Sequence, residues 1–283
     1  MKIILSRKGF DSSCGGAPSP ILPDGALLSL PIPSKDSPIA YQDLRFGDGS
    51  LGRLVEDLTQ GRIRSAGGAH LDPDLRPSIR QRLAGWRPLF GQDGTAQAHL
   101  VNAGVGVGDL FLFFGWFRRT ERTREGYRFV KGAPDLHVLF GWLQIGAIWP
   151  VEERRSEVPA WAKYHPHVHG DSEGKNTLYV AREDLRLPGM SKGAAGGGVF
   201  DNYQEQLRLT APGHTRTVWR LPEWFFPKDS RPPLTYHRRR DRWTPADDHT
   251  ILRSVPRGQE FVLDVEHYPE AIAWARDLIV RTI

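Results

Sequence analysis

The sequence predicts an α+β protein with a curved, mostly antiparallel β core, a few peripheral helices and long loops. Residues 109–117 and 136–149 form two blocks that are dense in Phe, Leu, Trp and Ile, which is typical of strands buried on both faces. Gly115, Gly141 and Gly146 interrupt these blocks, and glycine within a strand indicates a bulge or a sharp bend. Curvature of this kind favours a barrel.

Elements of the N-terminal half follow from local composition. Residues 2–5 predict a first strand because aliphatic side chains run together there. Apolar residues recur at helical spacing from Leu51 to Leu58, which predicts a short helix over 51–58. The remaining expectations are a Gly-, Pro- and Ser-rich loop at 9–25, a strand-like run at 26–32, a loop at 70–77 and a helical turn at 78–83.

The C-terminal half is expected to add short strands and one helix. The expected strands lie at 127–130, 177–180, 207–209, 218–221 and 261–265. The closing segment 269–279 predicts a helix, because Pro269 suits a first helical turn and the apolar residues that follow share one face. The Gly-rich segment 189–198 lacks the ending of a phosphate-binding P-loop and is expected to be a flexible loop.

Length and composition predict one soluble, cytoplasmic globular domain over residues 1–283. The central barrel core would occupy about residues 101–185. The apolar run at the start is too short for a signal peptide or a membrane span, and no membrane association is expected. Cys14 is the sole cysteine, which excludes an intramolecular disulfide and a Cys-based zinc site.

The N-terminal loop RKGFDSSCGG is the first candidate site. It follows a strand and presents Lys8 and Asp11, which can share charge with a phosphate or a proton with a substrate. An ordinary polar loop, in which Asp11 caps its own turn, is the alternative. Cys14 is a weaker candidate nucleophile, because no histidine neighbours it to activate the thiol.

The segment FGQDGTAQAHLVN is the second candidate, because its polar residues lead into a buried strand. The amide of Gln92 can read a base edge as paired donor and acceptor, and His99 can act as a general base near neutral pH. The alternative is that Gln92 and His99 satisfy buried backbone groups.

His165 and His167 form an H-x-H pattern that predicts a metal site. Alternate residues of a strand face one side, so the two imidazoles could chelate one ion together with a carboxylate such as Asp171 or Glu173. Pro166 argues against a central strand. A surface loop that happens to hold histidines is the alternative.

A basic, aromatic segment near the C-terminus predicts nucleic-acid binding, since guanidinium groups hold phosphates and aromatic faces stack bases. The residues expected to contact nucleic acid are Arg216, Arg220, Arg238, Arg239, Arg240 and Trp243. The alternative is core packing of the Trp residues beneath a solvated, arginine-rich face.

Two resemblances narrow the fold and the function. The strings GDLFLFF, starting at Gly108, and FGWLQIGAIWPVE resemble the core of a PUA-like barrel, the fold of ASCH and EVE domains. Seven strings along nearly the whole chain resemble the family called nucleotide modification associated domain 3: RKGFDSSCGGAPSPI, HLDPDL, FGQDGTAQAHL, GDLFLFFGWF, GWLQIG, NTLYVA and GQEFVLD. The second resemblance implies a role beside base modification in DNA or nucleotides, and it assigns no catalytic residue.

We therefore expect a protein of nucleic-acid or nucleotide base modification. Its site would be formed by Lys8, Asp11, Asp72, Gln92 and His99, which supply cations, carboxylates and amides around a displaced base. One alternative is a non-catalytic reader that holds a modified base in an aromatic pocket. Another is an enzyme that acts on a small nucleotide or sugar.

Overall fold

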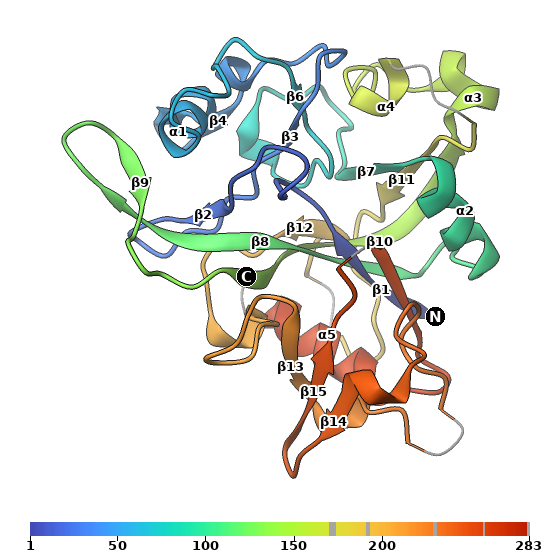
Figure 1. Cartoon of the computed structure of the whole chain (residues 1–283). Coiled ribbons are helices and arrows are strands. Elements are labelled where there is room, and N and C mark those ends of the chain that lie inside the picture. Colours follow the sequence, from blue (N-terminus) through green and yellow to red (C-terminus); the bar gives the residue numbers. More distant parts are fainter. Residues whose placement is uncertain (170–173, 191–192, 229–230, 257, 282–283) are drawn as a thin grey trace.

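An open, curved sheet forms the centre of the computed structural model (Figure 1). The model describes residues 1–169, 174–190, 193–228, 231–256 and 258–281. The path across the sheet runs β16 (Glu260–Asp264), β1 (Lys2–Arg7), β8 (Leu110–Arg122), β10 (Leu136–Pro150), β11 (Thr177–Ala181) and β7 (Leu89–Gln92). Three short strands attach beside this path: β2 (Ser19–Ile21), β9 (Tyr127–Phe129) and β12 (Gly197–Val199). Most pairings are antiparallel, as predicted, while β1 and β2 run parallel to β8.

The two apolar blocks form the longest strands, β8 and β10, and these pair with each other. Their inner residues are buried on both faces, and each large apolar side chain of this kind stabilises the fold by about 1.5–3 kcal/mol. A bulge lies between Leu139 and Gly141. A Cβ atom on Gly141 would lie 2.7 Å from the carbonyl oxygen of Gly198, so glycine permits this close approach.

The sheet does not close into a barrel, which corrects the expectation of a PUA-like barrel over residues 101–185. Among the described residues, no backbone ladder joins the end strands β16 and β7. Their side chains meet instead: Gln92 Nε2 of β7 donates to Glu260 Oε1 of β16 over 2.7 Å. The curvature inferred from the glycines is thus real, and polar side chains occupy the place where backbone bonds would complete a barrel.

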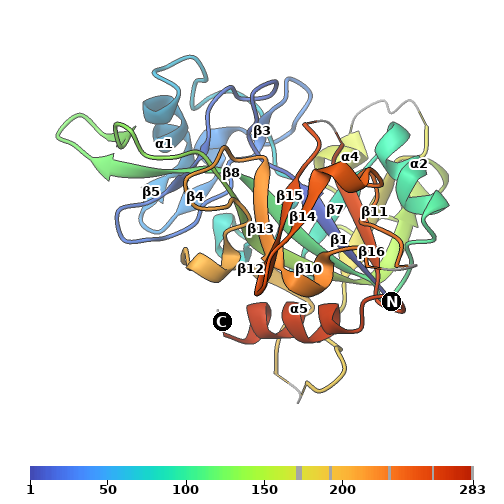
Figure 2. The same cartoon turned by 60° about the horizontal axis from the view of Figure 1, so that its bottom comes forward.

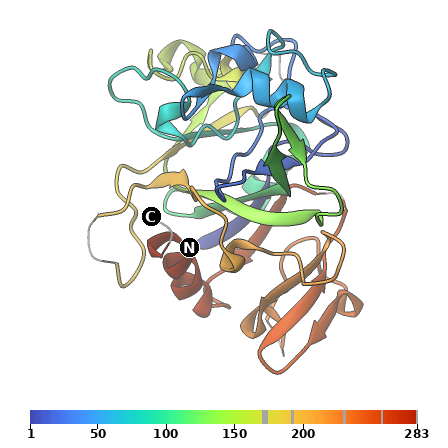
Figure 3. The same ribbon diagram turned by 90° about the vertical axis from the view of Figure 1, so that its left-hand side faces the viewer.

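Two further layers cover the sheet at opposite ends of the molecule (Figures 1 and 3). The N-terminal layer has its own apolar cluster and contains α1 (Leu51–Leu58), β3 (Ile32–Pro33), β4 (Arg45–Phe46), β5 (Gly49–Ser50) and β6 (Ala69–His70). The C-terminal layer shares the core of the main sheet and contains β13 (Val218–Pro222), β14 (Trp243–Pro245), β15 (His249–Arg253) and α5 (Glu270–Val280). Figure 2 shows α5 running beneath the sheets.

Short helices complete the chain. The α-helices not yet named are α2 (Gly94–Asn102), α3 (Val151–Arg154) and α4 (Pro166–His169). Single 3-10 turns lie at Tyr41–Asp43, Pro77–Ile79, Arg155–Glu157, Glu205–Leu207, Glu223–Phe225 and Arg240–Arg242. Within the described part of the chain, no helix has the length and apolarity needed to cross a bilayer.

Several local expectations were wrong because tertiary contacts override local composition. The histidine run at 165–169 contains helical turn α4 rather than a strand, and the polar run after Gln92, for which no element was predicted, is helix α2. In place of the strand expected at 207–209, Leu207 ends a 3-10 turn and Arg208 forms an isolated bridge with Val138. Of the run 26–32, only Ile32 joins a strand. The strand at the start of the chain and the helix over 51–58 are confirmed.

We predict that His137, within β10, makes stability fall in acid. Burial, aided by the positive charges of Arg7 and Arg216, lowers the pKa of His137 from 6.5 to about 3. Below pH 6.5 the unfolded chain binds a proton at this site that the native state excludes, so the free energy of unfolding decreases as the pH falls. Urea denaturation at pH 7 and pH 5 should show a loss about 2 kcal/mol larger in the wild type than in His137→Gln.

Glutamine is the matched substitution, because it cannot titrate and can still accept the hydrogen bond that Trp219 Nε1 donates to His137 Nδ1 over 3.0 Å. The remaining histidines contribute equally to the pH dependence of stability in the wild type and in the variant. Equal losses of stability in wild type and variant would contradict a depressed pKa at His137.

Candidate functional site

One short strand, β7, holds two groups of polar side chains together. All four residues of β7 are buried, and its pairing with β11 places Gln92 opposite Thr177. The side chain of Gln92 reaches Glu260, whereas the backbone N–H of Gly91 donates to Asp72 Oδ1 over 2.6 Å. We call Ser6, Lys8, Gln92 and Glu260 the Glu260 cluster. We call His70, Asp72, His165 and His167 the His–Asp cluster.

In the Glu260 cluster, three donors converge on one carboxylate oxygen. Glu260 Oε1 lies 2.9 Å from Lys8 Nζ and accepts hydrogen bonds from Gln92 Nε2 at 2.7 Å and Ser6 Oγ at 3.1 Å. The residue is 1% exposed, and its second oxygen, Oε2, has no hydrogen-bond partner among the described residues. A buried acceptor without a partner costs free energy, and a catalytic or ligand-binding role is one explanation for such a group in a native structure.

Lys8 links the two clusters. Its ammonium lies 4.6 Å from the centre of the Phe90 ring in β7, and it also donates to Gln259 Oε1 over 3.4 Å. Its positive charge contributes to lowering the pKa of His70. The exposed Gln259 and Asp93 flank this region at the surface. Lys8 therefore lies between the buried Glu260 carboxylate, the histidines and solvent.

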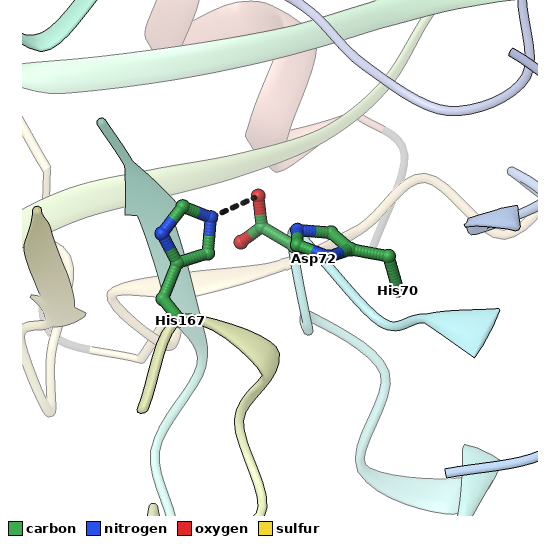
Figure 4. A group of neighbouring side chains, drawn as sticks. All are labelled: His70, Asp72 and His167. Atoms are coloured by element: carbon green, nitrogen blue, oxygen red, sulfur yellow. Dashed lines mark ion pairs between the residues drawn. The ribbon is translucent and has the colours of Figure 1, made fainter. Parts of the chain in front are cut away.

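In the His–Asp cluster, imidazoles surround one buried carboxylate (Figure 4). His167 Nε2 lies 3.9 Å from Asp72 Oδ2, and one ligand atom from each of His70, Asp72 and His167 lies within 4.8 Å of the others. His165 Nε2 lies 3.3 Å from Asp72 Oδ1, but the contact is not aligned as a hydrogen bond. Both ring nitrogens of the fully buried His165 lack a hydrogen-bond partner among the described residues.

The pKa values of this cluster define its charge state. Burial alone would raise the pKa of Asp72, but the contact with His165 and the field of His167 outweigh it and hold the pKa well below its usual range. Burial lowers the pKa of His70 to about 4 against the opposing field of Asp72, and burial also lowers the pKa of His167. At neutral pH the cluster thus combines neutral His70 and His167 imidazoles with an ionised carboxylate.

Gly91 and Asn176 fix the orientation of His167. A Cβ atom on Gly91 would lie 2.2 Å from His167 Cδ2, so only glycine lets the imidazole rest against the backbone of β7. Asn176 Nδ2 donates to the His167 carbonyl over 2.7 Å, which leaves Asn176 Oδ1 to face His167 Nδ1 at 2.8 Å. Because that amide oxygen can only accept, the proton is assigned to Nδ1, and the lone pair on Nε2 faces Asp72.

The structure brings together only some of the residues expected from the sequence. Lys8 and Gln92 meet at Glu260, and Asp72 lies on the other side of β7. His99 lies on α2 at the edge of the Glu260 cluster, where its Nε2 is 3.2 Å from Thr235 Oγ1. Burial lowers the pKa of His99, and the charge of Glu260 opposes this shift.

Asp11 lies away from these clusters, on a separate cavity. Its Oδ1 accepts bonds of 2.7 Å from the backbone N–H groups of Ser13 and Cys14, so it caps its own turn. The cavity, of about 370 Å³, is lined by Asp11 together with Arg7 and Arg216. Strand β1 ends at Arg7, and Gly9, with a φ of 80°, breaks the extended run between Lys8 and Asp11.

The expected nucleic-acid residues have different environments. Arg238, Arg239 and Arg240 are exposed, and Arg239 pairs with Asp241 at 2.5 Å. Trp243 is buried and donates to the His237 carbonyl, so its ring packs in the core and is not available to stack on a base. The other expected contacts are Arg216, which lies 4.2 Å from the Trp116 ring, and Arg220, which pairs with Asp248 at 2.8 Å.

Sequence reasoning missed two residues at the centre of the site, His70 and Glu260. The H-x-D spacing of His70 and Asp72 was an available signal, since alternate residues of an extended segment share a face. Glu260 begins an otherwise apolar strand, but nothing nearby indicates that its partner is Lys8. Asp171 and Glu173, the expected additional ligands, lie outside the described residues.

A family model described as nucleotide modification associated domain 3 matches residues 2–264. No curated protein and no solved structure gives a significant match to the chain.

We predict that Lys8 and Glu260 are strongly coupled in stability. The Lys8 side chain is 10% exposed and that of Glu260 1%, so removing either partner leaves a buried charge uncompensated. Lys8→Met should lower the free energy of unfolding by about 3–5 kcal/mol. In the double variant with Glu260→Gln, the loss should be smaller than the sum of the single losses by about 1–3 kcal/mol in urea denaturation.

Arg128 and Glu121 provide the matched control, because this ion pair of 2.9 Å is exposed on both sides. The same cycle with Arg128→Met and Glu121→Gln should give a coupling of about 0–1 kcal/mol. Additive losses at Lys8 and Glu260 would show that the pair is not coupled as its burial implies.

Proposed function

Because the chain belongs to the nucleotide modification associated domain 3 family, we propose that it acts enzymatically on the base of a nucleotide or of nucleic acid at the Glu260 cluster. The observation that carries this proposal is the buried oxygen Glu260 Oε2, which lacks a partner while Oε1 receives three donors. A ligand that offers an N–H group would satisfy Oε2. The amino and imide edges of nucleobases offer such groups.

Each residue of the Glu260 cluster has a chemical role in this proposal. Glu260 accepts a hydrogen bond from the base and can serve as a general base toward the same N–H. Gln92 and Ser6 orient the carboxylate through their bonds to Oε1. Lys8 supplies the positive charge that would stabilise negative charge developing on the base.

Two partly buried arginines support nucleic acid as the larger ligand. Arg7, Asp11 and Arg216 line one cavity, where burial is the main cause that lowers the pKa of Arg7, the charge of Asp11 opposes this shift, and the charge of Arg216 adds to it. Two guanidinium groups against one carboxylate leave an excess of positive charge in this cavity, which favours an anion such as a backbone phosphate. Arg7 and Lys8 are consecutive, so a phosphate and a base could be held at the same end of β1.

A non-catalytic reader of modified bases is the alternative. The burial of Trp219, Trp243 and Phe225 removes three aromatic rings from a binding surface. The aromatic residue that stays exposed near the Glu260 cluster is Tyr236, whose ring centre lies 4.7 Å from that of His99. Fewer residues therefore support non-catalytic binding of a modified base than support an enzymatic function.

We predict that Glu260→Gln weakens nucleotide binding and abolishes base modification. The amide leaves the shape of the side chain nearly unchanged but removes the charge that accepts the base N–H, so affinity should fall about 10–100-fold. Isothermal titration with mononucleotides, single strands and duplexes would measure the affinity. Nucleoside mass spectrometry of DNA from cells that produce each protein would measure the product.

Glu121→Gln, at the exposed ion pair, is the control and should behave as the wild type. Circular dichroism would restrict the comparison to conditions where each variant is folded. Unchanged affinity and unchanged product in folded Glu260→Gln would overturn the assignment. A loss of affinity without any product in the wild type would favour the reader, and binding of mononucleotides alone would favour a small-nucleotide enzyme.

We predict that Arg238 contributes to the salt dependence of DNA binding. A Lys or Arg that contacts one phosphate changes the slope of log affinity against log salt concentration by about 0.7–0.9. Arg238→Gln should reduce the slope by about this amount, as measured by fluorescence anisotropy at several salt concentrations. Arg239→Gln should have a smaller effect, because Asp241 already pairs with Arg239; equal effects, or none, would contradict a specific role for Arg238.

A further inference from the structure

We propose that His70, Asp72 and His167 bind one divalent transition-metal ion. These residues come from two parts of the chain: His70 ends β6 and Asp72 follows it by two positions, whereas His167 lies in α4. Each offers one ligand atom, and the three atoms lie within 4.8 Å of one another. Figure 4 shows the two imidazoles on either side of the Asp72 carboxylate.

The donor set indicates the class of metal. Two imidazole nitrogens and one carboxylate oxygen suit borderline ions such as Fe²⁺, Zn²⁺ or Co²⁺. Mg²⁺ and Ca²⁺ prefer sites made mostly of oxygen, which these residues do not provide. Three protein ligands also leave coordination positions open for water or a substrate, as in catalytic rather than structural sites.

The orientation of His167 supports a cation between His167 and Asp72. Asn176 Oδ1 faces Nδ1 at 2.8 Å, and the opposite nitrogen, Nε2, directs its lone pair at Asp72 Oδ2, 3.9 Å away. Two lone-pair donors that face each other in a buried site repel unless a cation or a proton lies between them. A metal-binding histidine typically donates its other ring N–H to a neighbour in this way.

The contacts of Asp72 with Gly91 and His165 involve Oδ1, so Oδ2 can coordinate the ion. Its other oxygen, Oδ1, accepts the Gly91 N–H at 2.6 Å and lies 3.3 Å from His165 Nε2. His165 is fully buried and has two ring nitrogens without partners among the described residues. His165 approaches the carboxylate at Oδ1 rather than at Oδ2, and His70 replaces it as the second histidine ligand of the H-x-H prediction.

The ligand atoms must draw closer when the ion binds. Bonds of about 2.0–2.2 Å place neighbouring ligand atoms roughly 3.0–3.5 Å apart, less than the 3.9 Å between His167 Nε2 and Asp72 Oδ2. His70 ends the two-residue strand β6, and His167 lies within the single helical turn α4. Modest rotations of these side chains would complete the site, whereas β7 holds Asp72 in place through Gly91.

The test is a titration of the full chain, purified without a histidine tag and stripped with EDTA, with Co²⁺ alone. We expect one ion per chain, visible absorption bands of Co²⁺ bound to nitrogen and oxygen, and a raised melting temperature on binding. His70→Gln, Asp72→Asn and His167→Gln should each weaken binding at least 10-fold. Asn176→Leu should weaken it about 10–100-fold while one ion still binds per chain.

His169→Gln is the matched control, because His169 belongs to the same histidine run but directs its Nε2 to the Lys163 carbonyl at 2.6 Å. It should bind Co²⁺ as the wild type does. The proposal is overturned if the wild type binds no ion and its melting temperature does not respond to Co²⁺. It is equally overturned if His169→Gln loses binding as fully as His167→Gln.

Elemental analysis of protein produced in rich medium, without EDTA, would distinguish iron from zinc as the resident ion. Nucleotide titrations of the EDTA-stripped protein separate this inference from the proposed function. Loss of nucleotide affinity in Glu260→Gln with no Co²⁺ binding in the wild type would reject the metal site alone. Co²⁺ binding with no response to Glu260→Gln would reject the base site alone.

Discussion

The buried carboxylate of Glu260 is the contact on which the centre of this molecule depends. Glu260 begins the end strand β16 and accepts a hydrogen bond from Gln92 of the other end strand, β7. Among the described residues, no backbone ladder joins these two strands. Lys8, at the end of the neighbouring strand β1, supplies the compensating charge. A barrel closed by backbone bonds would have needed none of these groups. The opening in the sheet therefore gives the fold a place for a charged site in its core.

The same constraint explains why the His–Asp cluster lies next to the Glu260 cluster. Strand β7 is only four residues long. The side chain of its Gln92 donates to Glu260, and the backbone N–H of its Gly91 donates to Asp72. Moving β7 would disturb both clusters together. The pKa of His70 responds to both Asp72 and Lys8, which is a direct electrostatic sign of that proximity. A ligand that displaces Lys8 from Glu260 would thus also change the electrostatic field at His70.

Local sequence patterns were sufficient for elements stabilised by their own apolar residues. The helix at Leu51–Leu58 has the predicted bounds and β10 nearly has them, because their periodicity and burial agree, whereas β8 continues to Arg122, five residues beyond the predicted block. The run 165–169 shows the limit. Alternation suggested a strand, yet Pro166 begins a helical turn there, and both His165 and His167 still face Asp72. The sequence indicated that His165 and His167 act near one another, but it did not indicate the helical turn that positions them.

The candidate site was harder to predict because its partners lie far apart in the chain. Lys8 and Glu260 are 252 positions apart by residue number, and only the pairing of β1 with β16 brings them together. Asp11 stands three residues after Lys8, yet it lines another cavity, because Gly9, with a φ of 80°, breaks the extended run between them. Nearness in sequence was therefore a poor guide to shared function, and strand register was the deciding information. Two polar residues on one face of paired strands can form a common site even though the local sequence around each residue does not indicate that site.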